Sequence, residues 1–311
     1  MSQKNAAIYG GQAVIEGVMF AGKSVHVTAV RRKNNEISFL EVPKTEKAWM
    51  HNLKKIPLLR GLVAIIEASA KGSLHLNYSA EVYAEEEGGE EAVKDTKEPS
   101  IAAKVSLYLG VAIIGVISFV VGKLVFTLVP PAIEQIAFQN LFENQIAHNL
   151  LEGVIKIIFL CSYIYFISLT PIVKRLFQYH GAEHKVISAY EAGMELTVPN
   201  VQRFNTLHYR CGSSFIILTV IIGVIIYSFV QYDNFTERII QRIILLPLVI
   251  GVSYEALRFT NSLRDTPVLR YLGYPGLWLQ KLTTKQPEDA QVEVSIASFN
   301  RMKELDRLAS Q

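Results

Sequence analysis

The chain is organised around the sequence YHGAEHKVISAYE, residues 179–191, which holds two histidines and a glutamate within five positions. Residues three and four apart share one face of a helix, with about 5–6 Å between their Cβ atoms. We therefore expect His180, Glu183 and His184 to point the same way. Glu191 lies two turns further on and can join the same face. Two imidazoles at this spacing can bind one cation, and a glutamate beside them can polarise a bound water.

A second group of potential ligands follows in the sequence HYRC, which begins at His208. His208 and Cys211 are three residues apart, so one helical turn or a tight loop brings them together. With His180 and His184 they form a mixed nitrogen and sulfur set. Such a set suits Zn²⁺ or another divalent transition metal. Arg210, which lies between the two ligands, is a further candidate for the site.

The order His-x-x-Glu-His also matches the inverted zinc peptidases, in which two histidines bind zinc and the glutamate is the general base. The match covers five residues, and the sequence does not identify the distant glutamate ligand of those enzymes. Glu191 is too close in sequence to replace it. The alternative is that His180 and His184 meet lipid headgroups and that Cys211 is a buried thiol.

The composition indicates a membrane protein. Half of the 311 residues are hydrophobic and 19% are charged, below the roughly 25% of charged residues in soluble domains. The apolar residues gather in four runs, and a membrane-spanning helix needs about 20 such residues. The runs are residues 105–129, 150–170, 215–230 and 239–257. We expect the first run to stop at Pro130-Pro131 and the second at Pro171, with Glu152 and Arg242 near the ends of their runs.

The loops between these runs differ in charge. Residues 132–149 contain no lysine or arginine, whereas residues 172–214 contain five. Because cytosolic loops carry an excess of lysine and arginine, the second loop and both termini are expected in the cytosol. We therefore predict an α-helical, multi-pass protein of the plasma (cytoplasmic) membrane with about four transmembrane helices. Residues 101–260 form its membrane domain, and residues 261–311 form a cytosolic tail.

The segments before the membrane domain predict a small cytosolic unit and a connecting helix. Residues 1–50 alternate apolar and polar side chains between turn signals, which predicts a β-rich meander. Residues 51–80 have helical spacing interrupted by charges, which predicts an amphipathic helix on the membrane surface or one packed in the protein. Residues 81–100 are acidic and predict a linker without a core.

Local signals refine two of these segments. Gly10, Gly11 and Gly17 indicate backbone that turns sharply or approaches a neighbour closely. In the tail, the acidic residues Glu288 and Asp289 indicate the first turn of a helix that continues to Leu308. We expect this helix to dock onto the rest of the protein.

Two charged residues outside the His-rich loop are further candidates for the site. Glu16 interrupts the apolar sequence VIEGVM of an expected strand, where it either faces outward or points into the site. Arg60 lies seven residues before Glu67 on one helix face, and the two form either a solvated stripe or a functional pair. At the end of the last span, the spacing of Glu255 and Arg258 favours a local ion pair.

Composition also limits the partners. Two cysteines exclude a disulfide framework, and Cys161 lies inside an apolar run. The net charge of +3 follows from the positive-inside rule, and no basic block is interleaved with aromatic residues. We therefore expect membrane lipids as partners and no nucleic acid, and leave open a membrane-protein partner or a homo-oligomer. The N-terminus has no apolar stretch, so no cleaved signal peptide is expected.

Several motifs resemble the YqhQ family of bacterial multi-pass membrane proteins. They extend over nearly the whole chain and read GGQAVIEGVM, LLRGLVAIIEAS with LNYSAE, YHGAEHKVISAYE, LHYRCGSSF and TTKQPEDAQVEVSIA. The family carries a domain of unknown function, and its members are described as predicted metal-dependent enzymes. The resemblance implies the membrane topology given above and a metal at His180, Glu183, His184, His208 and Cys211, but no particular reaction. The first motif of this chain ends in Phe20-Ala21-Gly22, whereas the family motif ends in a Met-Arg type of sequence. This difference argues against a role for a basic residue at that position.

These observations predict a membrane-embedded metal-dependent enzyme, hydrolytic in type, with its site on the cytosolic face. His180 and His184 would hold the metal together with either His208 or Cys211, which leaves one position open for water. Glu183 would act as general base, and Glu16 and Arg60 would orient the substrate.

Two other classes of protein are weighed against this one. The main alternative is a non-catalytic membrane scaffold or assembly factor, in which all four ligands close a structural metal site. A transporter fits less well, because the spans lack paired Gly/Pro-broken segments and midplane polar groups.

Overall fold

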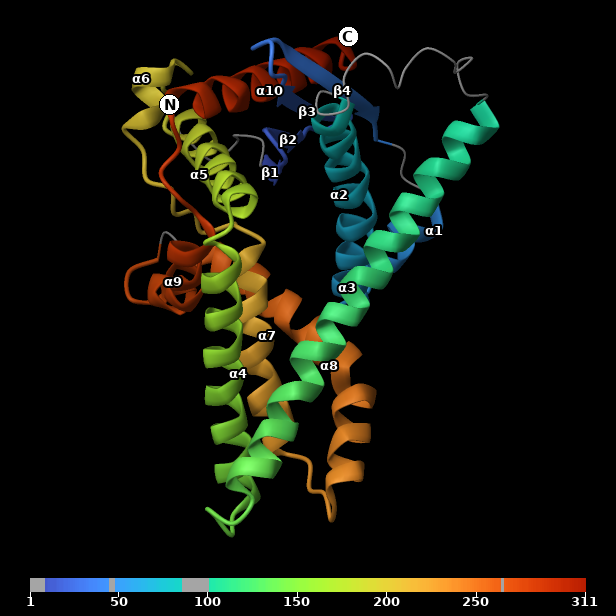
Figure 1. Cartoon of the computed structure of the whole chain (residues 1–311), viewed down its shortest axis with the longest axis vertical. Helices are drawn as coiled ribbons and strands as arrows, with labels where there is room; N and C mark the ends of the chain where they lie inside the picture. Colours follow the sequence, from blue (N-terminus) through green and yellow to red (C-terminus); the bar gives the residue numbers. More distant parts are fainter. Residues whose placement is uncertain (1–8, 45–47, 86–100, 264–265) are drawn as a thin grey trace.

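The structure, a computed structural model, describes residues 9–44, 48–85, 101–263 and 266–311. It is mostly helical and carries a small N-terminal antiparallel sheet (Figure 1). Within these described ranges, three helices are long and apolar enough to cross a membrane: Val116–Phe138, Gln145–Ile167 and Phe235–Ser262. These helices indicate that the protein associates with a membrane.

The N-terminal sheet is a meander of four antiparallel strands in the order β1-β2-β3-β4, as expected. The strands are β1 (Gly10–Val14), β2 (Gly17–Ala21), β3 (Val25–Arg31) and β4 (Ile37–Pro43). The predicted alternation in β3 is confirmed. Val25, Val27 and Ala29 join the main hydrophobic core on one face. Thr28, on the other face, contacts the buried His75 of α2 (Leu59–Glu85).

The expected strand through VIEGVM is broken, which corrects the sequence-based prediction for Glu16. Val14 pairs with Gly17, so Ile15 and Glu16 form a two-residue hairpin turn. Glu16 adopts a φ of 52°, in the left-handed region that non-glycine residues rarely occupy. The glycine after it is required by space, because a Cβ at Gly17 would lie 2.1 Å from the carbonyl oxygen of Ala29.

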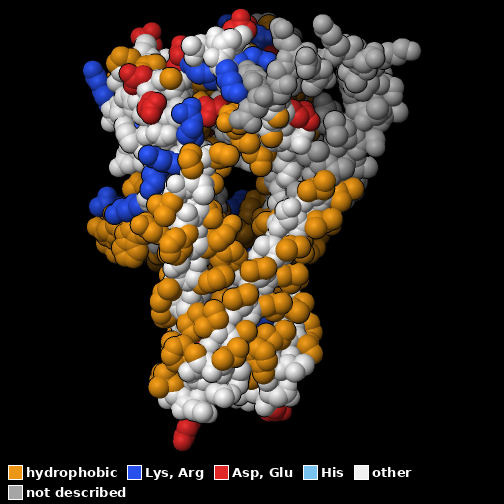
Figure 2. Space-filling model, in the orientation of Figure 1, with side chains coloured by type: hydrophobic (Ala, Val, Ile, Leu, Met, Phe, Trp, Pro, Cys, Tyr) orange, Lys and Arg blue, Asp and Glu red, His pale blue; other side chains and the backbone are white. Residues whose placement is uncertain are grey.

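Four helices extend away from the sheet and pack against one another (Figure 1). They are α3 (Ile101–Phe138), α4 (Gln145–Ile167), α7 (Ser213–Ser228) and α8 (Phe235–Ser262). α7 has 16 residues and is therefore about 24 Å long, less than the roughly 30 Å of a bilayer core. Hydrophobic side chains cover the visible face over α3 and α4, and charged side chains gather towards the sheet (Figure 2).

The two expected span boundaries differ in outcome. The first apolar run does not stop at Pro130-Pro131, because α3 continues through both prolines to Phe138. Packed membrane helices tolerate proline where neighbouring groups satisfy the freed backbone carbonyls. The second boundary is confirmed: Pro171 is the first residue of α5 (Pro171–Glu191), where its missing N–H would have had no helical partner.

The connecting helix α2 packs against α3, α8 and the sheet. It therefore lies within the protein, which was one of the two readings of residues 51–80. α2 continues to Glu85, through the first residues of the acidic linker predicted for 81–100. The rest of that linker lies outside the described residues. The remaining short elements are α1 (Ala48–Leu53), α6 (Val198–Gln202), the 3₁₀ helix η3 (Leu269–Gly273) and α9 (Tyr274–Thr283).

The predicted tail helix is confirmed as α10 (Asp289–Leu308). It begins with a capping box, in which the side chains of Glu288 and Gln291 bond each other's backbone N–H groups. Val292, Phe299 and Met302 are buried against the sheet and α5 in the main hydrophobic core. α5 and α10 thus cover one face of the sheet, and α2 contacts the other.

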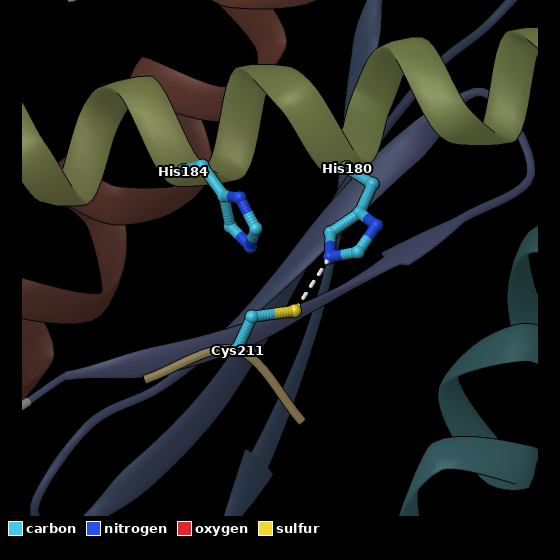
Figure 3. A group of neighbouring side chains, drawn as sticks. All are labelled: His180, His184 and Cys211. Atoms are coloured by element: carbon cyan, nitrogen blue, oxygen red, sulfur yellow. Dashed lines mark hydrogen bonds between the residues drawn. The ribbon is translucent and has the colours of Figure 1, made fainter. Parts of the chain in front are cut away.

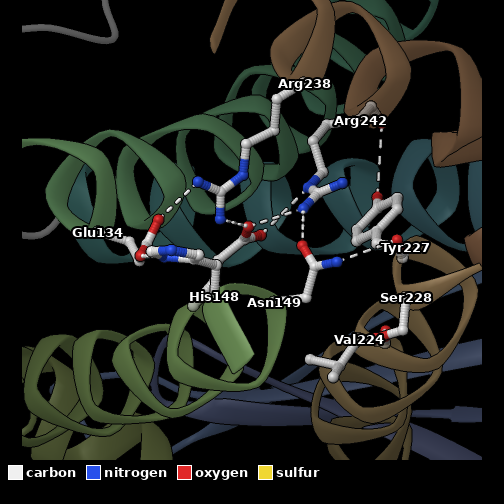
Figure 4. A network of polar contacts seen from close by, with 9 residues as sticks. Glu134, His148, Asn149, Val224, Tyr227, Ser228, Arg238 and Arg242 are labelled. Carbon is white, nitrogen blue, oxygen red and sulfur yellow. Dashed lines mark hydrogen bonds and ion pairs between the residues drawn. The ribbon is translucent and has the colours of Figure 1, made fainter. Parts of the chain in front are cut away.

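At the far end of the helices, opposite the sheet, a buried ion network joins α3, α4 and α8 (Figure 4). Arg238 donates to Glu134 at 2.5 Å and to Glu152 at 2.8 Å. Arg242 donates to Glu152 at 2.8 Å and to the side-chain oxygen of Asn149 at 2.7 Å. The sequence places Glu152 and Arg242 near the ends of their apolar runs but does not predict that they bind each other. Pairing explains how these groups can be buried among apolar helices.

Candidate metal centre

Three predicted ligands meet beside the middle of α5, which packs against β1 and β2. One ligand atom from each of His180, His184 and Cys211 lies within 4.8 Å of the others. Both imidazole rings project from the same side of α5 towards the Cys211 sulfur (Figure 3). The Nε2 of His180 lies 3.2 Å from this sulfur, and the two ring centroids are 4.5 Å apart. The four-residue helical spacing therefore produces the shared face that the sequence predicts.

Backbone carbonyls orient both rings. The Nδ1 of His180 donates to the carbonyl oxygen of Thr283 at 2.8 Å, and the Nδ1 of His184 donates to that of Thr206 at 2.5 Å. A carbonyl oxygen only accepts, so in the neutral ring the proton lies on Nδ1 and Nε2 keeps a lone pair. Metal-binding histidines commonly have this second contact. Neither threonine carbonyl is visible in a sequence pattern, because each comes from a distant segment.

Gly181, between the two histidines, allows the backbone around Lys285 to pack closely against α5. A Cβ at Gly181 would lie 2.2 Å from the carbonyl oxygen of Lys285, so this helix position accepts only glycine without a shift of the backbone. This approach places Thr283, two residues before Lys285, against the His180 ring. The sequence-based prediction did not include Gly181, although a glycine inside a helix can mark such a close approach.

The Nε2 of His184 is buried near the Cys211 sulfur and makes no hydrogen bond of normal geometry among the described residues. The ring itself is 1% exposed. Burial lowers the pKa of His184, against the opposing effect of Cys211, so the ring is neutral at pH 7. A buried acceptor without a well-formed hydrogen bond costs free energy, and a metal ion would satisfy it. The residues present therefore fit a bound transition metal.

A cavity of about 360 Å³ lies beside the cluster, between β1, α5 and the segment around Cys211. Glu183 lines it and is 5% exposed. Burial raises the pKa of Glu183, while His180, His208 and a hydrogen bond from the Gly11 backbone act in the opposite direction. A Cβ at Gly11 would lie 3.0 Å from the Glu183 carboxylate, which is the close approach that the glycine predicts. No contact of this kind explains Gly10.

The remaining residues of the His-rich segment are arranged around a second carboxylate. Glu191 forms an ion pair with Arg210 and lies 3.6 Å from the Nε2 of His208. His208 and Arg210 line the cavity, and the His208 ring is 5.7 Å from the His184 ring. His208 therefore lies next to the three-residue cluster but not within it. Of the two alternatives for the third ligand, the geometry favours Cys211.

Neither Glu16 nor Arg60 lines this cavity. Glu16 accepts two hydrogen bonds from Arg175, both 2.5 Å, and one from Tyr179, and so ties the first hairpin to α5. Arg60 binds both carboxylate oxygens of Glu255 on α8. The local pair expected between Glu255 and Arg258 is thus replaced by a contact between two helices. The expected role of Glu16 and Arg60 in orienting a substrate has no support from their positions.

Fold and site together define a mostly helical protein with candidate membrane helices and a His/His/Cys cluster covered by a small antiparallel sheet. The family model described as "Protein of unknown function (DUF1385)" matches residues 56–305, and the chain belongs to this family. It is 50% identical over 303 residues to a Bacillus subtilis (strain 168) protein named "Uncharacterized protein YqhQ", covering 97% of this chain and 94% of that relative. The resemblance to the YqhQ family is therefore confirmed. No solved structure matches the chain.

Proposed function

We propose that this protein is a membrane-embedded, metal-dependent hydrolytic enzyme whose metal is held by His180, His184 and Cys211. One observation carries the proposal: three ligand atoms lie within 4.8 Å of one another beside a cavity, and the buried Nε2 of His184 makes no hydrogen bond of normal geometry within the described residues. Nitrogen and sulfur donors favour Zn²⁺ among the divalent metals available to proteins.

Three protein ligands are typical of a catalytic zinc site, whereas a structural site usually has four. His208, the candidate for a fourth, lies near Glu191 instead. This arrangement favours an enzyme over the scaffold alternative. A metal in this cluster would act as a Lewis acid and lower the pKa of a water molecule in the open position.

Glu183 is the residue proposed to move the proton. Its carboxylate is held by the Gly11 backbone on the wall of the same cavity, one helix position from His184. A buried carboxylate in this position can accept a proton from water and return it to a leaving group. Arg210 lines the cavity, and its ion pair with Glu191 would weaken its attraction for a negatively charged substrate.

We further propose that α7 is a fourth span and that both termini lie in the cytosol. α7 packs against α4 and α8, both candidate spans, and its sequence is mainly apolar and contains no charged residue. An even number of spans puts both ends of the chain on one side of the plasma membrane, and the lysines and arginines of residues 172–214 indicate the cytosolic side.

Metal content tests the proposed ligands. Purified wild-type protein is expected to contain about one zinc per chain, since such sites bind zinc tightly. His184→Ala and Cys211→Ser should lose most of it, measured by elemental analysis. Cys161→Ser and His51→Ala are the matched controls, because both residues lie outside the cluster, and they should keep the metal. Wild-type protein without metal, or equal metal in all variants, would contradict the proposal.

Glu183→Gln separates catalysis from metal binding. The variant should keep its metal and lose activity by roughly 10²–10⁴-fold, because an amide cannot act as the base. Hydrolysis of ester, peptide and phosphoester test substrates would be measured for both proteins. A firmly bound metal without any turnover in the wild type would instead favour a structural site in a membrane scaffold.

A further inference from the structure

A second cavity, of about 900 Å³, lies where the sheet, α2 and the last turns of α8 meet. None of its described lining residues also lines the cavity beside the metal cluster. Among the residues that the structure describes, six cationic side chains line it together with one carboxylate, that of Glu67. The cations are Lys23, Lys44, Lys54, Arg60, Lys71 and Arg258. They come from segments far apart in the sequence, so only the folded chain brings them together.

The carboxylates nearby balance only part of this charge, because Arg60 is paired with Glu255 and the other cations share Glu67 and Asp306. Glu67 accepts from Lys54 at 2.6 Å and from Lys71 at 2.5 Å, so one negative charge is shared between two lysines. Lys44 donates to the carbonyl oxygen of Gly22 at 2.6 Å. Asp306 and Glu67 favour its charged form, but burial and the neighbouring Lys71 outweigh them and lower the pKa of Lys44. Like charges in a partly enclosed space repel one another, and an anion between them would relieve this cost.

A buried histidine points to a ligand independently of the charge. His26 lines the cavity and is 6% exposed. Neither of its ring nitrogens has a hydrogen-bond partner within the described part of the chain. The neighbouring His75 ring, 5.9 Å away, bonds Thr28 instead. Buried polar groups are nearly always hydrogen-bonded, so two nitrogens of one ring without partners indicate a missing contact.

We propose that this cavity binds a phosphate group, either the headgroup of an anionic lipid or free phosphate. Phosphate carries up to two charges and several acceptor oxygens, which match clustered lysines, an arginine and a ring N–H. The cavity lies at the end of α8, one of the candidate membrane helices, where a lipid headgroup can reach it. This inference is independent of the proposed enzymatic function and concerns a separate site.

The test measures binding of inorganic phosphate to the full chain in detergent. Binding is followed by calorimetry at constant ionic strength, with chloride as the reference anion. Wild-type protein should show saturable binding. Lys44→Gln and Lys71→Gln should each weaken it about tenfold or more, because each removes a charge-assisted contact. Arg307→Gln, which removes an exposed cation of α10 outside the cavity lining, is the matched control and should bind as the wild type does.

Two more variants keep the result interpretable. Lys44→Arg retains the charge and should retain binding, which separates loss of charge from loss of fold. Cys211→Ser should bind phosphate normally, which separates this site from the metal cluster. Thermal unfolding of each variant checks that it is folded. Saturable binding that is equal in wild type, Lys44→Gln, Lys71→Gln and Arg307→Gln, or no saturable binding at all, would overturn the proposal.

Lipid discs distinguish the two sources. If a lipid headgroup is the ligand, discs that contain phosphatidylglycerol should abolish phosphate binding, whereas discs of phosphatidylcholine alone should preserve it. If free phosphate is the ligand, binding should be the same in both kinds of disc. Either result supports the site and identifies the source of the phosphate.

Discussion

At the scale of single residues, buried histidines outside the metal cluster make the protein sensitive to acid. His75 is fully buried on α2, and its Nδ1 lies 2.7 Å from the Thr28 hydroxyl. Burial, with a smaller effect of Lys71, lowers the pKa of His75 from 6.5 to about 4. Below pH 6.5 the unfolded chain therefore binds a proton that the folded chain does not. Stability contributed by the neutral ring is present above pH 6.5 and is lost as the pH falls towards 4.

His75→Gln should reduce this sensitivity. A shift from 6.5 to about 4 corresponds to about 3 kcal/mol of unfolding free energy. Between pH 7 and pH 4, the wild type should thus lose about 3 kcal/mol more than the variant, measured by thermal unfolding across a pH series. His26 has a similarly lowered pKa and remains in both proteins, so the variant keeps part of the effect. His51→Gln, an exposed histidine on α1, should follow the wild type; parallel curves for all three proteins would contradict the assignment.

At the scale of helices, ion pairs between elements hold the bundle together. Glu255 on α8 binds Arg60 near the start of α2, at the end close to the sheet. At the far end, Glu152 on α4 accepts from both Arg238 and Arg242 on α8. The first contact joins residues 195 positions apart in the chain. These pairs link helices that are distant in the chain.

Arg242→Met should destabilise the bundle by about 3–5 kcal/mol, because it leaves part of the charge of buried Glu152 without its partner. The double variant Arg242→Met/Glu152→Gln should lose less than the sum of the two single variants, since the two residues are coupled. Thermal unfolding in detergent measures both. Arg258→Met, an exposed arginine of the same helix, should change stability by less than about 0.5 kcal/mol. Additive losses in the double variant would show that the network is not a coupled unit.

At the scale of the whole molecule, the arrangement separates an apolar helical part from a charged part that contains the sheet and both cavities (Figures 1 and 2). Large hydrophobic side chains such as Ile136, Phe166 and Ile244 are exposed on the helical part. Exposed apolar surface of this kind suits contact with lipid. The metal cluster lies in the charged part, where a soluble substrate can approach it.

Accessibility labelling tests the proposed topology. Asn140→Cys lies in the exposed turn between α3 and α4, and Ser310→Cys lies after α10. With four spans and cytosolic termini, a membrane-impermeant maleimide should label the cysteine at 140 in intact cells. The cysteine at 310 should react only after the cells are opened. Both variants are made in a Cys161→Ser/Cys211→Ser background, which removes the native thiols. Labelling of both positions in intact cells would contradict an even number of spans.

Much of the fold and part of the site could be predicted from the sequence, because those features depend on neighbours in the chain. Helical spacing alone put His180, Glu183 and His184 on one side of α5, and alternation alone predicted the two faces of β3. Apolar runs located the candidate spans. The continuation of α3 beyond Pro130-Pro131 could not be predicted in this way, because it depends on packing against other helices.

Contacts between distant segments were decided only by the tertiary structure. Local spacing could not choose between His208 and Cys211, since both follow α5 by a similar distance and only the path of the loop turns the sulfur inward. The carbonyls of Thr206 and Thr283 and the partner of Arg60 are likewise set by packing. The physical reason is range: backbone geometry relates residues three or four positions apart, whereas burial of apolar surface brings together segments separated by tens to hundreds of residues.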